Sequence, residues 1–137
     1  MSQENVEIVR SAIASWNAGN MDAVRDGLDP NVVATPLQGW PEQGPFVGRD
    51  AVMAWYGQVR EAWDIDTVEA IRFVEAGDRV LVRVRWHGAG QGPESTMEFT
   101  AVYTMRKGGT VYIEFFWDHA EALEAVGLSE QDAHAES

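Results

Sequence analysis

Apolar residues near the beginning of the chain recur every three or four positions, which is the spacing of an amphipathic helix. The first run predicts a helix over residues 3–18 that ends at Gly19. Its apolar members are Val6, Val9, Ile13 and Trp16. Asn20 can cap a second, short helix that reaches Leu28 and stops at the Asp-Pro pair of residues 29–30. The two helices are expected to form a hairpin.

A third helical run follows a segment rich in proline and glycine. Residues 31–35 carry paired valines and predict a short strand, whereas residues 36–48 contain three prolines among glycines and predict a loop. Apolar and aromatic residues then repeat at helical spacing, and they predict a long amphipathic helix. The residues of this run are Val52, Trp55, Tyr56, Val59 and Trp63.

From Asp66 onward the apolar period changes to two, which is the period of a β-strand. Four strands are predicted, over residues 68–74, 80–86, 97–105 and 111–117. The alternation assigns one row of the last three strands to the interior, namely Val82, Val84, Trp86, Met97, Phe99, Ala101, Tyr103, Ile113, Phe115 and Trp117. Asp118 then caps a final short helix that ends at Gly127.

This order of elements predicts an α+β fold, because the helices are segregated from a series of long antiparallel strands. A chain of 137 residues is large enough to build one core without metal or disulfide support. We therefore expect a single domain over residues 1–128, followed by a polar C-terminal tail over residues 129–137 that is expected to fray.

The charge balance narrows the range of expected partners. Lys and Arg total 10 against 22 for Asp and Glu, which gives a formal charge of −12 and repels nucleic-acid phosphates and anionic membrane surfaces. A neutral or cationic apolar ligand fits this charge better. There is no cysteine, and the three histidines lack metal-ligand spacing, so no metal and no cofactor are expected. Residues 1–5 show no signal-peptide pattern, and a cytoplasmic location is expected.

Five short segments together resemble the SnoaL-like branch of the nuclear transport factor 2-like superfamily. They are residues 15–23 (SWNAGNMDA), 28–32 (LDPNV), 48–52 (GRDAV), 77–80 (GDRV) and 118–123 (DHAEAL). That family includes polyketide cyclases, ketosteroid isomerases, limonene epoxide hydrolases and dehydratases. The resemblance implies a cystatin-like roll, in which a conical, mostly antiparallel sheet wraps over about three helices and encloses a pocket for a small hydrophobic molecule.

The resemblance also indicates where catalytic groups would stand. Cyclases and epoxide hydrolases of this fold resemble each other in placing an acid three residues before the Asp that starts the final helix, and relatives often carry a His on the preceding strand. The matching positions here are Phe115 and Ala101, so both expected slots are apolar. Tyr103 is the best inward polar group and the candidate catalytic residue. Its hydroxyl can donate to a ligand carbonyl or a developing oxyanion, or bond to the backbone.

The candidate pocket is lined mainly by carbon. Its predicted residues are Trp16, Trp40, Trp55, Tyr56, Val82, Val84, Trp86, Phe99, Ala101, Phe115 and Trp117. The same side chains can instead fill the interior as an ordinary core, because six tryptophans and a long helix occupy much space. The feature that distinguishes the two is a carboxylate, His or Tyr that points into a void.

Three hypotheses about function stay open at this stage. The first is a homodimeric pocket protein for a small apolar organic molecule that, if it is an enzyme, performs cofactor-free acid/base chemistry as an isomerase, cyclase, hydrolase or lyase. The second is a noncatalytic binding or dimerisation module, and the third is a redesigned pocket on this scaffold. The expected dimer surface is the outer face of the sheet, with the apolar residues Leu81, Val102, Tyr112 and Phe116 among the charged residues Arg83, Arg85, Glu98 and Glu114.

Overall fold

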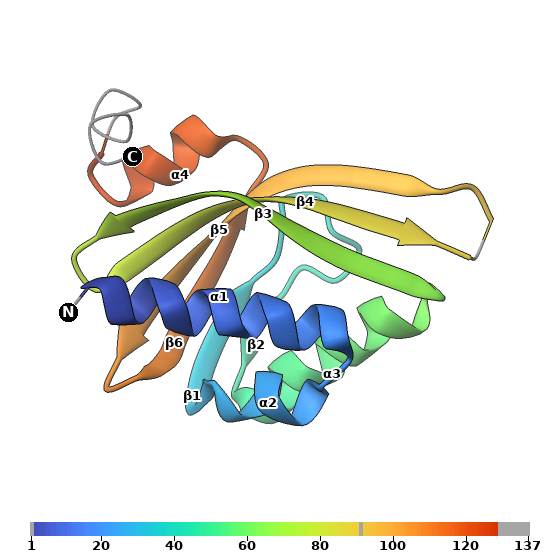
Figure 1. Ribbon diagram of the computed structural model, residues 1–137, viewed down its shortest axis with the longest axis horizontal. Coiled ribbons are helices and arrows are strands. Elements are labelled where there is room, and N and C mark those ends of the chain that lie inside the picture. Colours follow the sequence, from blue (N-terminus) through green and yellow to red (C-terminus); the bar gives the residue numbers. More distant parts are fainter. Residues whose placement is uncertain (1, 91, 129–137) are drawn as a thin grey trace.

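The computed structural model describes residues 2–90 and 92–128, in which four helices accompany one curved sheet of six strands (Figure 1). The helices are α1 (Ser2–Ala18), α2 (Met21–Asp26), α3 (Arg49–Glu61) and α4 (His119–Ala125). The strands are β1 (Leu28–Thr35), β2 (Phe46–Val47), β3 (Ile65–Ala76), β4 (Arg79–Ala89), β5 (Ser95–Arg106) and β6 (Gly109–Phe116). The predicted α+β class is confirmed, whereas the predicted tail over residues 129–137 lies outside the described residues.

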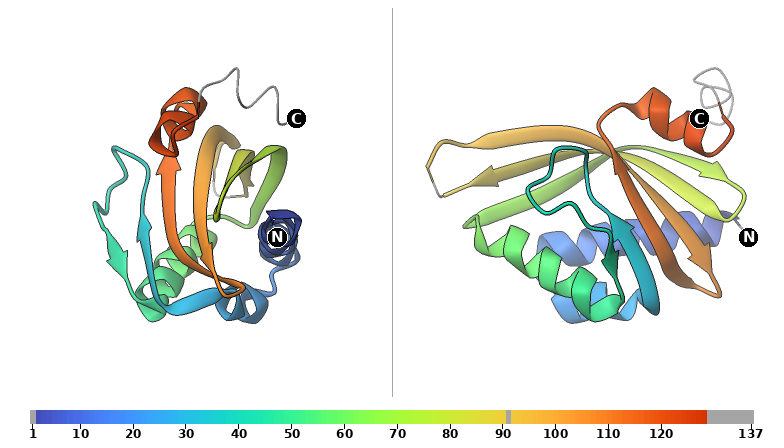
Figure 2. Two further views of the ribbon diagram at one scale, coloured as in Figure 1. Left: turned by 90° about the vertical axis from the view of Figure 1, so that its left-hand side faces the viewer. Right: turned by 180° about the vertical axis from the view of Figure 1, so that it is seen from behind.

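The strands follow the order β2-β1-β6-β5-β4-β3 across the sheet. Among the described strands, β1 and β6 run parallel and every other neighbouring pair runs antiparallel. Helices α1, α2 and α3 lie on one side of the sheet and α4 lies on the other, as Figure 2 shows from the end and from behind. The sheet is therefore covered by helices on both faces.

The register of the long strands matches the predicted alternation. Val84 of β4 lies opposite Phe99 of β5, Val82 lies opposite Ala101, and Ala101 in turn lies opposite Phe115 of β6. Because partners directly opposite each other share a face of the sheet, these residues form one continuous apolar row.

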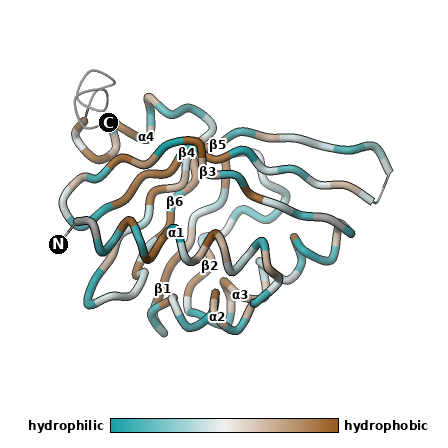
Figure 3. The backbone as a smooth tube through the Cα atoms, viewed as in Figure 1, coloured by the Kyte–Doolittle hydropathy of each residue, from teal (hydrophilic) through white to brown (hydrophobic). Residues whose placement is uncertain are grey.

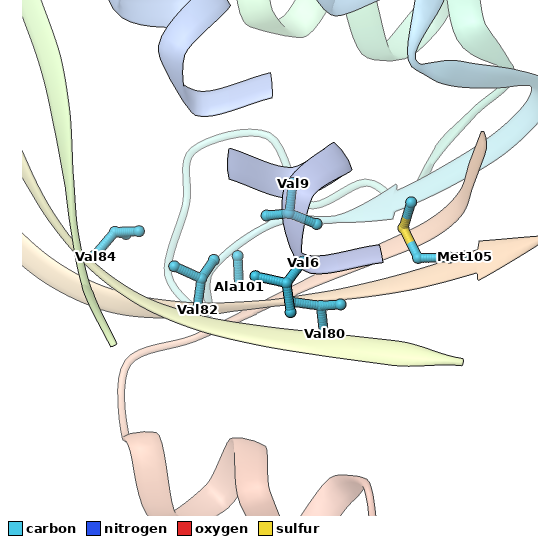
Figure 4. Close-up of a cluster of buried hydrophobic side chains, with 7 residues drawn as sticks. All are labelled: Val6, Val9, Val80, Val82, Val84, Ala101 and Met105. Atoms are coloured by element: carbon cyan, nitrogen blue, oxygen red, sulfur yellow. The ribbon is translucent and has the colours of Figure 1, made fainter. Parts of the chain in front are cut away.

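Two separate packing regions fix the helices to this row. The hydropathy of α1 alternates along its length (Figure 3), and its buried residues Val6 and Val9 pack on β4 and β5, where Figure 4 shows them beside Val80 and Val82. Helix α3 packs on β1 and β6 through the buried Val52 and Trp55. Because α1 and α3 rest on different strands, a space is left between them above the middle of the sheet.

Helix α4 covers part of the outer face, which corrects the expected dimer surface. Ala122 and Leu123 of α4 pack on Leu81, Val102 and Val74, and Leu81 and Val102 are 0% and 2% exposed within a single chain. Leu81 and Val102 therefore contribute to the fold of one subunit and are not available for contact with a second subunit. A homodimer through the rest of this face stays a prediction.

Several element boundaries differ from the predicted ones. Helix α2 ends earlier, because the buried Leu28 joins β1 and pairs with Thr110 of β6. Pro30 then lies inside β1, at a shift of register where its missing N–H breaks no ladder hydrogen bond. Part of the predicted loop forms β2, which pairs with β1, and Trp63 lies just after α3.

Several charged residues of the outer face pair across the strands. Arg85 contacts Glu98 at 2.9 Å and Glu69 at 3.3 Å, and Arg83 lies 3.8 Å from Glu98. Exposed pairs of this kind contribute little to stability. The charged residues of this face therefore serve mainly to keep it solvated. No helix in the described ranges is both long and apolar enough to cross a membrane.

Candidate ligand-binding site

A cavity of about 980 Å³ lies between α1, α3 and the inner face of the sheet. Apolar and aromatic side chains make up most of its wall. The predicted pocket residues that line it are Trp16, Trp40, Trp55, Tyr56, Val84, Trp86, Phe99, Ala101 and Phe115, together with Tyr103. The volume falls within the range of small-molecule pockets, so the interior is not simply filled.

Two predicted pocket residues lie elsewhere. Val82 is fully buried under α1, where it belongs to the packed core and does not reach the cavity. Trp117 is 44% exposed, and its indole donates a hydrogen bond to the Gln38 carbonyl at 2.9 Å. Because β6 ends at Phe116, the strand alternation no longer fixes the direction of the residue that follows it.

Sequence reasoning missed a stripe of mostly small residues on α1, two of them serines. Ile8, Ser11, Ala12 and Ser15 all line the cavity and recur three or four positions apart. This stripe runs beside the apolar stripe that contains Val6 and Val9. A run of small residues next to a core-facing row was the signal that α1 faces a space there, because small side chains leave room for something else.

The two positions at which relatives place catalytic groups carry apolar side chains in the structure as well. Phe115 and Ala101 face each other across β5 and β6, and both line the cavity. Within the described part of the chain, no three residues among His, Cys, Asp and Glu gather closely enough to hold a metal ion. The polar chemistry of the cavity therefore depends on other side chains.

Two tyrosines supply much of that chemistry. Tyr56 comes from α3 and Tyr103 from β5, and both line the cavity. Burial raises the pKa of Tyr103 to about 12. Burial also raises the pKa of Tyr56 far above its usual value, with a smaller contribution from repulsion by the neighbouring Tyr103. Both phenols are consequently neutral donors at physiological pH.

Neither phenol hydroxyl makes a hydrogen bond to another described residue. The ring of Tyr56 is held in place by aromatic neighbours: its centroid lies 5.3 Å from that of Trp16 and 5.4 Å from that of Trp55. Trp55 also packs edge-on against Phe115 at 5.5 Å. The aromatic contacts thus hold the Tyr56 ring in position while its hydroxyl stays available to a ligand.

Asp66 is a further polar residue beside the cavity, and sequence reasoning took it only as the start of the strand pattern. Its side chain is buried, with the residue 7% exposed. Oδ1 accepts hydrogen bonds from the indole N–H of Trp16 at 3.0 Å and of Trp86 at 2.6 Å. Oδ2 is also buried and has no hydrogen-bond partner among the described residues. The carboxylate therefore connects α1 to β3 and β4 at the wall of the cavity.

Asn17 strengthens the same connection. Its amide nitrogen donates to the Val68 carbonyl at 2.8 Å, and its amide oxygen accepts from the Val68 N–H at 2.8 Å. Because β3 is an edge strand, the side chain covers one pair of open backbone groups. The Trp16-Asn17 dipeptide thus attaches the end of α1 to the sheet through two adjacent residues.

The ring positions near Asp66 require a glycine at residue 88. Gly88 lies opposite Asp66 in the ladder, and a Cβ atom there would collide with the Trp86 ring and come within 2.7 Å of Trp63. We expect Gly88→Ala to displace these rings and to lower the free energy of unfolding by about 1–3 kcal/mol. Near-ultraviolet circular dichroism and urea denaturation measure the two effects.

Gly57→Ala is the matched control, because a Cβ atom at residue 57 of α3 meets nothing within 4 Å. This change is expected to leave the tryptophan signal intact and to raise stability by about 0.5–1 kcal/mol, since alanine favours helix. A Gly88→Ala protein with the wild-type spectrum and unfolding midpoint would show that the rings are not held as described.

A curved sheet wrapped over helices around an apolar cavity defines a protein of the nuclear transport factor 2-like fold. The family model described as a SnoaL-like domain matches residues 9–113, and the chain belongs to the SnoaL-like family. The predicted resemblance is confirmed. No match is found among curated protein sequences.

Solved structures with 20% sequence identity share the fold. Bal32a, from a soil-derived mobile gene cassette, has a TM-score of 0.77 over 83% of this chain and 88% of its own. TerC, co-crystallised with polyporic acid, has a TM-score of 0.73 over 90% and 98% of the two chains. A putative SnoaL-like polyketide cyclase from Jannaschia sp. CCS1 has a TM-score of 0.74 over 91% and 92%.

Proposed function

We propose that this chain binds a small, largely apolar organic molecule in its cavity, and that Tyr56 and Tyr103 donate hydrogen bonds to an oxygen atom of that molecule. The observation that carries the proposal is the pair of tyrosines lining an apolar cavity, whose hydroxyls have no partner in the described part of the chain. A hydroxyl that faces an apolar cavity is stabilised by a hydrogen-bond partner, and a carbonyl or enol oxygen of the ligand would supply one.

The same arrangement supports a catalytic version of the proposal. Two neutral donors on one oxygen polarise a carbonyl and stabilise the negative charge that develops when a neighbouring proton leaves or a bond shifts. A cofactor-free isomerase, cyclase, hydrolase or lyase would use Tyr103 in this way. Ligand binding without turnover is the alternative. The apolar side chains of Ala101 and Phe115 favour this alternative, because they offer the ligand neither an acid nor a base.

The comparisons support a ligand of this kind. TerC, which shares the fold, was co-crystallised with the small organic molecule polyporic acid, and the Jannaschia relative is a putative polyketide cyclase. The proposal extends to a cytoplasmic location and to a homodimer, as the sequence predicts.

A matched pair of probes tests the proposal. 2-Acetylnaphthalene carries a ketone oxygen, and 2-isopropylnaphthalene has a similar shape without it. We expect both probes to bind the wild-type protein. Tyr103→Phe and Tyr56→Phe are each expected to weaken binding of the ketone alone, by about 2- to 10-fold, since each change removes one hydrogen bond. Quenching of tryptophan fluorescence measures the affinities.

Tyr112→Phe is the control for this experiment. Tyr112 stands on the outer face of β6, where its hydroxyl lies 3.2 Å from Thr35 Oγ1, and it does not line the cavity. Its replacement is expected to leave both probes unaffected. If neither probe binds the wild-type protein, the proposed function is wrong; if both bind but the Phe variants behave like wild type, the role of the tyrosines is wrong.

A further inference from the structure

Three tryptophans around Asp66 and the facing Gly88 line the cavity. They are Trp16, Trp63 and Trp86, and the rings of Trp63 and Trp86 meet edge to face at 5.2 Å. The proposed role of the two tyrosines does not use this group. Its chemistry differs from that of the rest of the cavity, because a carboxylate lies directly behind the aromatic wall.

Asp66 is directed toward the inside of the molecule. Residues two apart on a strand share a face, and Val68, two positions further along β3, lines the cavity. Both hydrogen-bond donors to Asp66 come from indoles that also line it. The second carboxylate oxygen is buried without a described partner, so its negative charge is not neutralised by a direct ion pair.

The balance of charge around the cavity is also negative. Within the part of the chain that the structure describes, Glu7 is the one charged side chain of the lining, and no Lys or Arg is among the lining residues. The guanidinium of Arg60 lies over the Trp16 ring at 4.8 Å and donates to the Trp16 carbonyl at 3.0 Å. Arg60 thus occupies one face of Trp16, whereas no arginine or lysine in the described part of the chain stacks on Trp63 or Trp86.

These features favour a positively charged ligand group. The face of an indole ring carries negative potential, which makes tryptophan the best aromatic partner for an ammonium group. An indole N–H that donates to a carboxylate is polarised further in the same direction, and a buried negative charge acts strongly across a medium of low dielectric. The net charge of −12 adds a long-range attraction for cations.

We propose that the natural ligand carries a protonated amine or a quaternary ammonium group, which rests against Trp63 and Trp86 with the Asp66 carboxylate behind them. This inference rests on the proposed function, because the ammonium group belongs to the apolar molecule held in the same cavity. Asp66 acts through the two indoles and is a positioning and charge-setting residue, not a catalytic one. The cavity then selects organic amines over neutral molecules of the same shape.

Benzyltrimethylammonium and neopentylbenzene test this selection, because they have the same shape and differ by one positive charge. A purely apolar cavity would favour the hydrocarbon, since the cation has to shed its hydration. We expect the wild-type protein to bind the cation at least as tightly as the hydrocarbon at about 0.15 M ionic strength, where long-range attraction is screened. Fluorescence titration or isothermal calorimetry measures both affinities.

Asp66→Asn is the decisive variant, because an amide oxygen still accepts both indole hydrogen bonds while the charge is removed. We expect this variant to weaken binding of the cation by about tenfold and to leave binding of the hydrocarbon unchanged. Unchanged hydrocarbon binding also shows that the cavity is intact. Glu69→Gln is the matched control: it removes the same charge from the same strand, but Glu69 is exposed and pairs with Arg85.

Three outcomes would overturn the inference. The first is a wild-type protein that binds neopentylbenzene more tightly than the cation. The second is a loss of cation affinity below threefold in Asp66→Asn, and the third is an equal loss in Glu69→Gln. In each case binding of the neutral probes would leave the proposed function standing, whereas failure of every probe to bind would overturn both.

Discussion

Replacing Leu123 by alanine is expected to lower the free energy of unfolding by about 2–5 kcal/mol. Leu123 is 0% exposed and packs with Leu81 and Val102 between α4 and the outer face of the sheet. The substitution removes buried carbon and leaves a void that a short helix resting on a rigid sheet cannot close. Urea denaturation followed by circular dichroism measures the change.

Glu124→Ala is the control on the same helix, because Glu124 is exposed and its replacement is expected to change stability by no more than about 0.5 kcal/mol. A loss below about 1 kcal/mol for Leu123→Ala would mean that α4 is loosely attached. The outer face would then be open after all, and Leu81 and Val102 would return as candidates for a subunit interface.

The inner face of the sheet was predictable because side chains along each strand point alternately to its two faces. Val84, Phe99 and Phe115 alternate with outward-facing residues along β4, β5 and β6, and a one-residue slip would turn each of them outward. The outer face was harder to interpret. Apolar residues such as Leu81 and Val102 signal that something covers them, but the alternation does not say whether the cover is a second chain or a helix of the same chain.

The cavity could not be predicted as a volume, because the pattern of apolar residues is the same for a filled and a hollow interior. Val82 and Val84 share one face of β4, yet only Val84 reaches the cavity, since α1 packs directly on Val82. The path of α1 over the sheet decides this difference. It depends on long-range contacts such as the hydrogen bonds from Asn17 to Val68, which are 51 residues apart.

Asp66 was missed for a similar reason. A single acidic residue at the start of a strand is usually solvated, and nothing near it in the sequence suggests otherwise. Its partners Trp16 and Trp86 are 50 and 20 residues away, so the buried carboxylate exists only after α1 and β4 have come together. Tyr56 was identified as a pocket residue, but its nearness to Tyr103 also depends on the packing of α3 on β1 and β6.

Alkaline pH is expected to destabilise the protein through the two cavity tyrosines. An unfolded tyrosine has a pKa of about 10, whereas burial raises the pKa of Tyr103 in the folded chain to about 12 and raises that of Tyr56 as well. Below about pH 10 both states keep their protons and the stability is complete. Above about pH 10 the unfolded state loses protons that the folded state retains, so stability falls as pH rises.

The expected slope between about pH 10 and pH 12 is at most about 1.4 kcal/mol per pH unit for each tyrosine. Urea denaturation at a series of pH values measures it, and the Tyr56→Phe/Tyr103→Phe double variant should lose most of the decline, because phenylalanine has no proton to release. Tyr112→Phe, which keeps both cavity tyrosines, should decline like the wild type. An unchanged decline in the double variant would mean that the two phenols ionise in contact with water, and the hydrogen-bond donors proposed for the ligand would then be solvated groups.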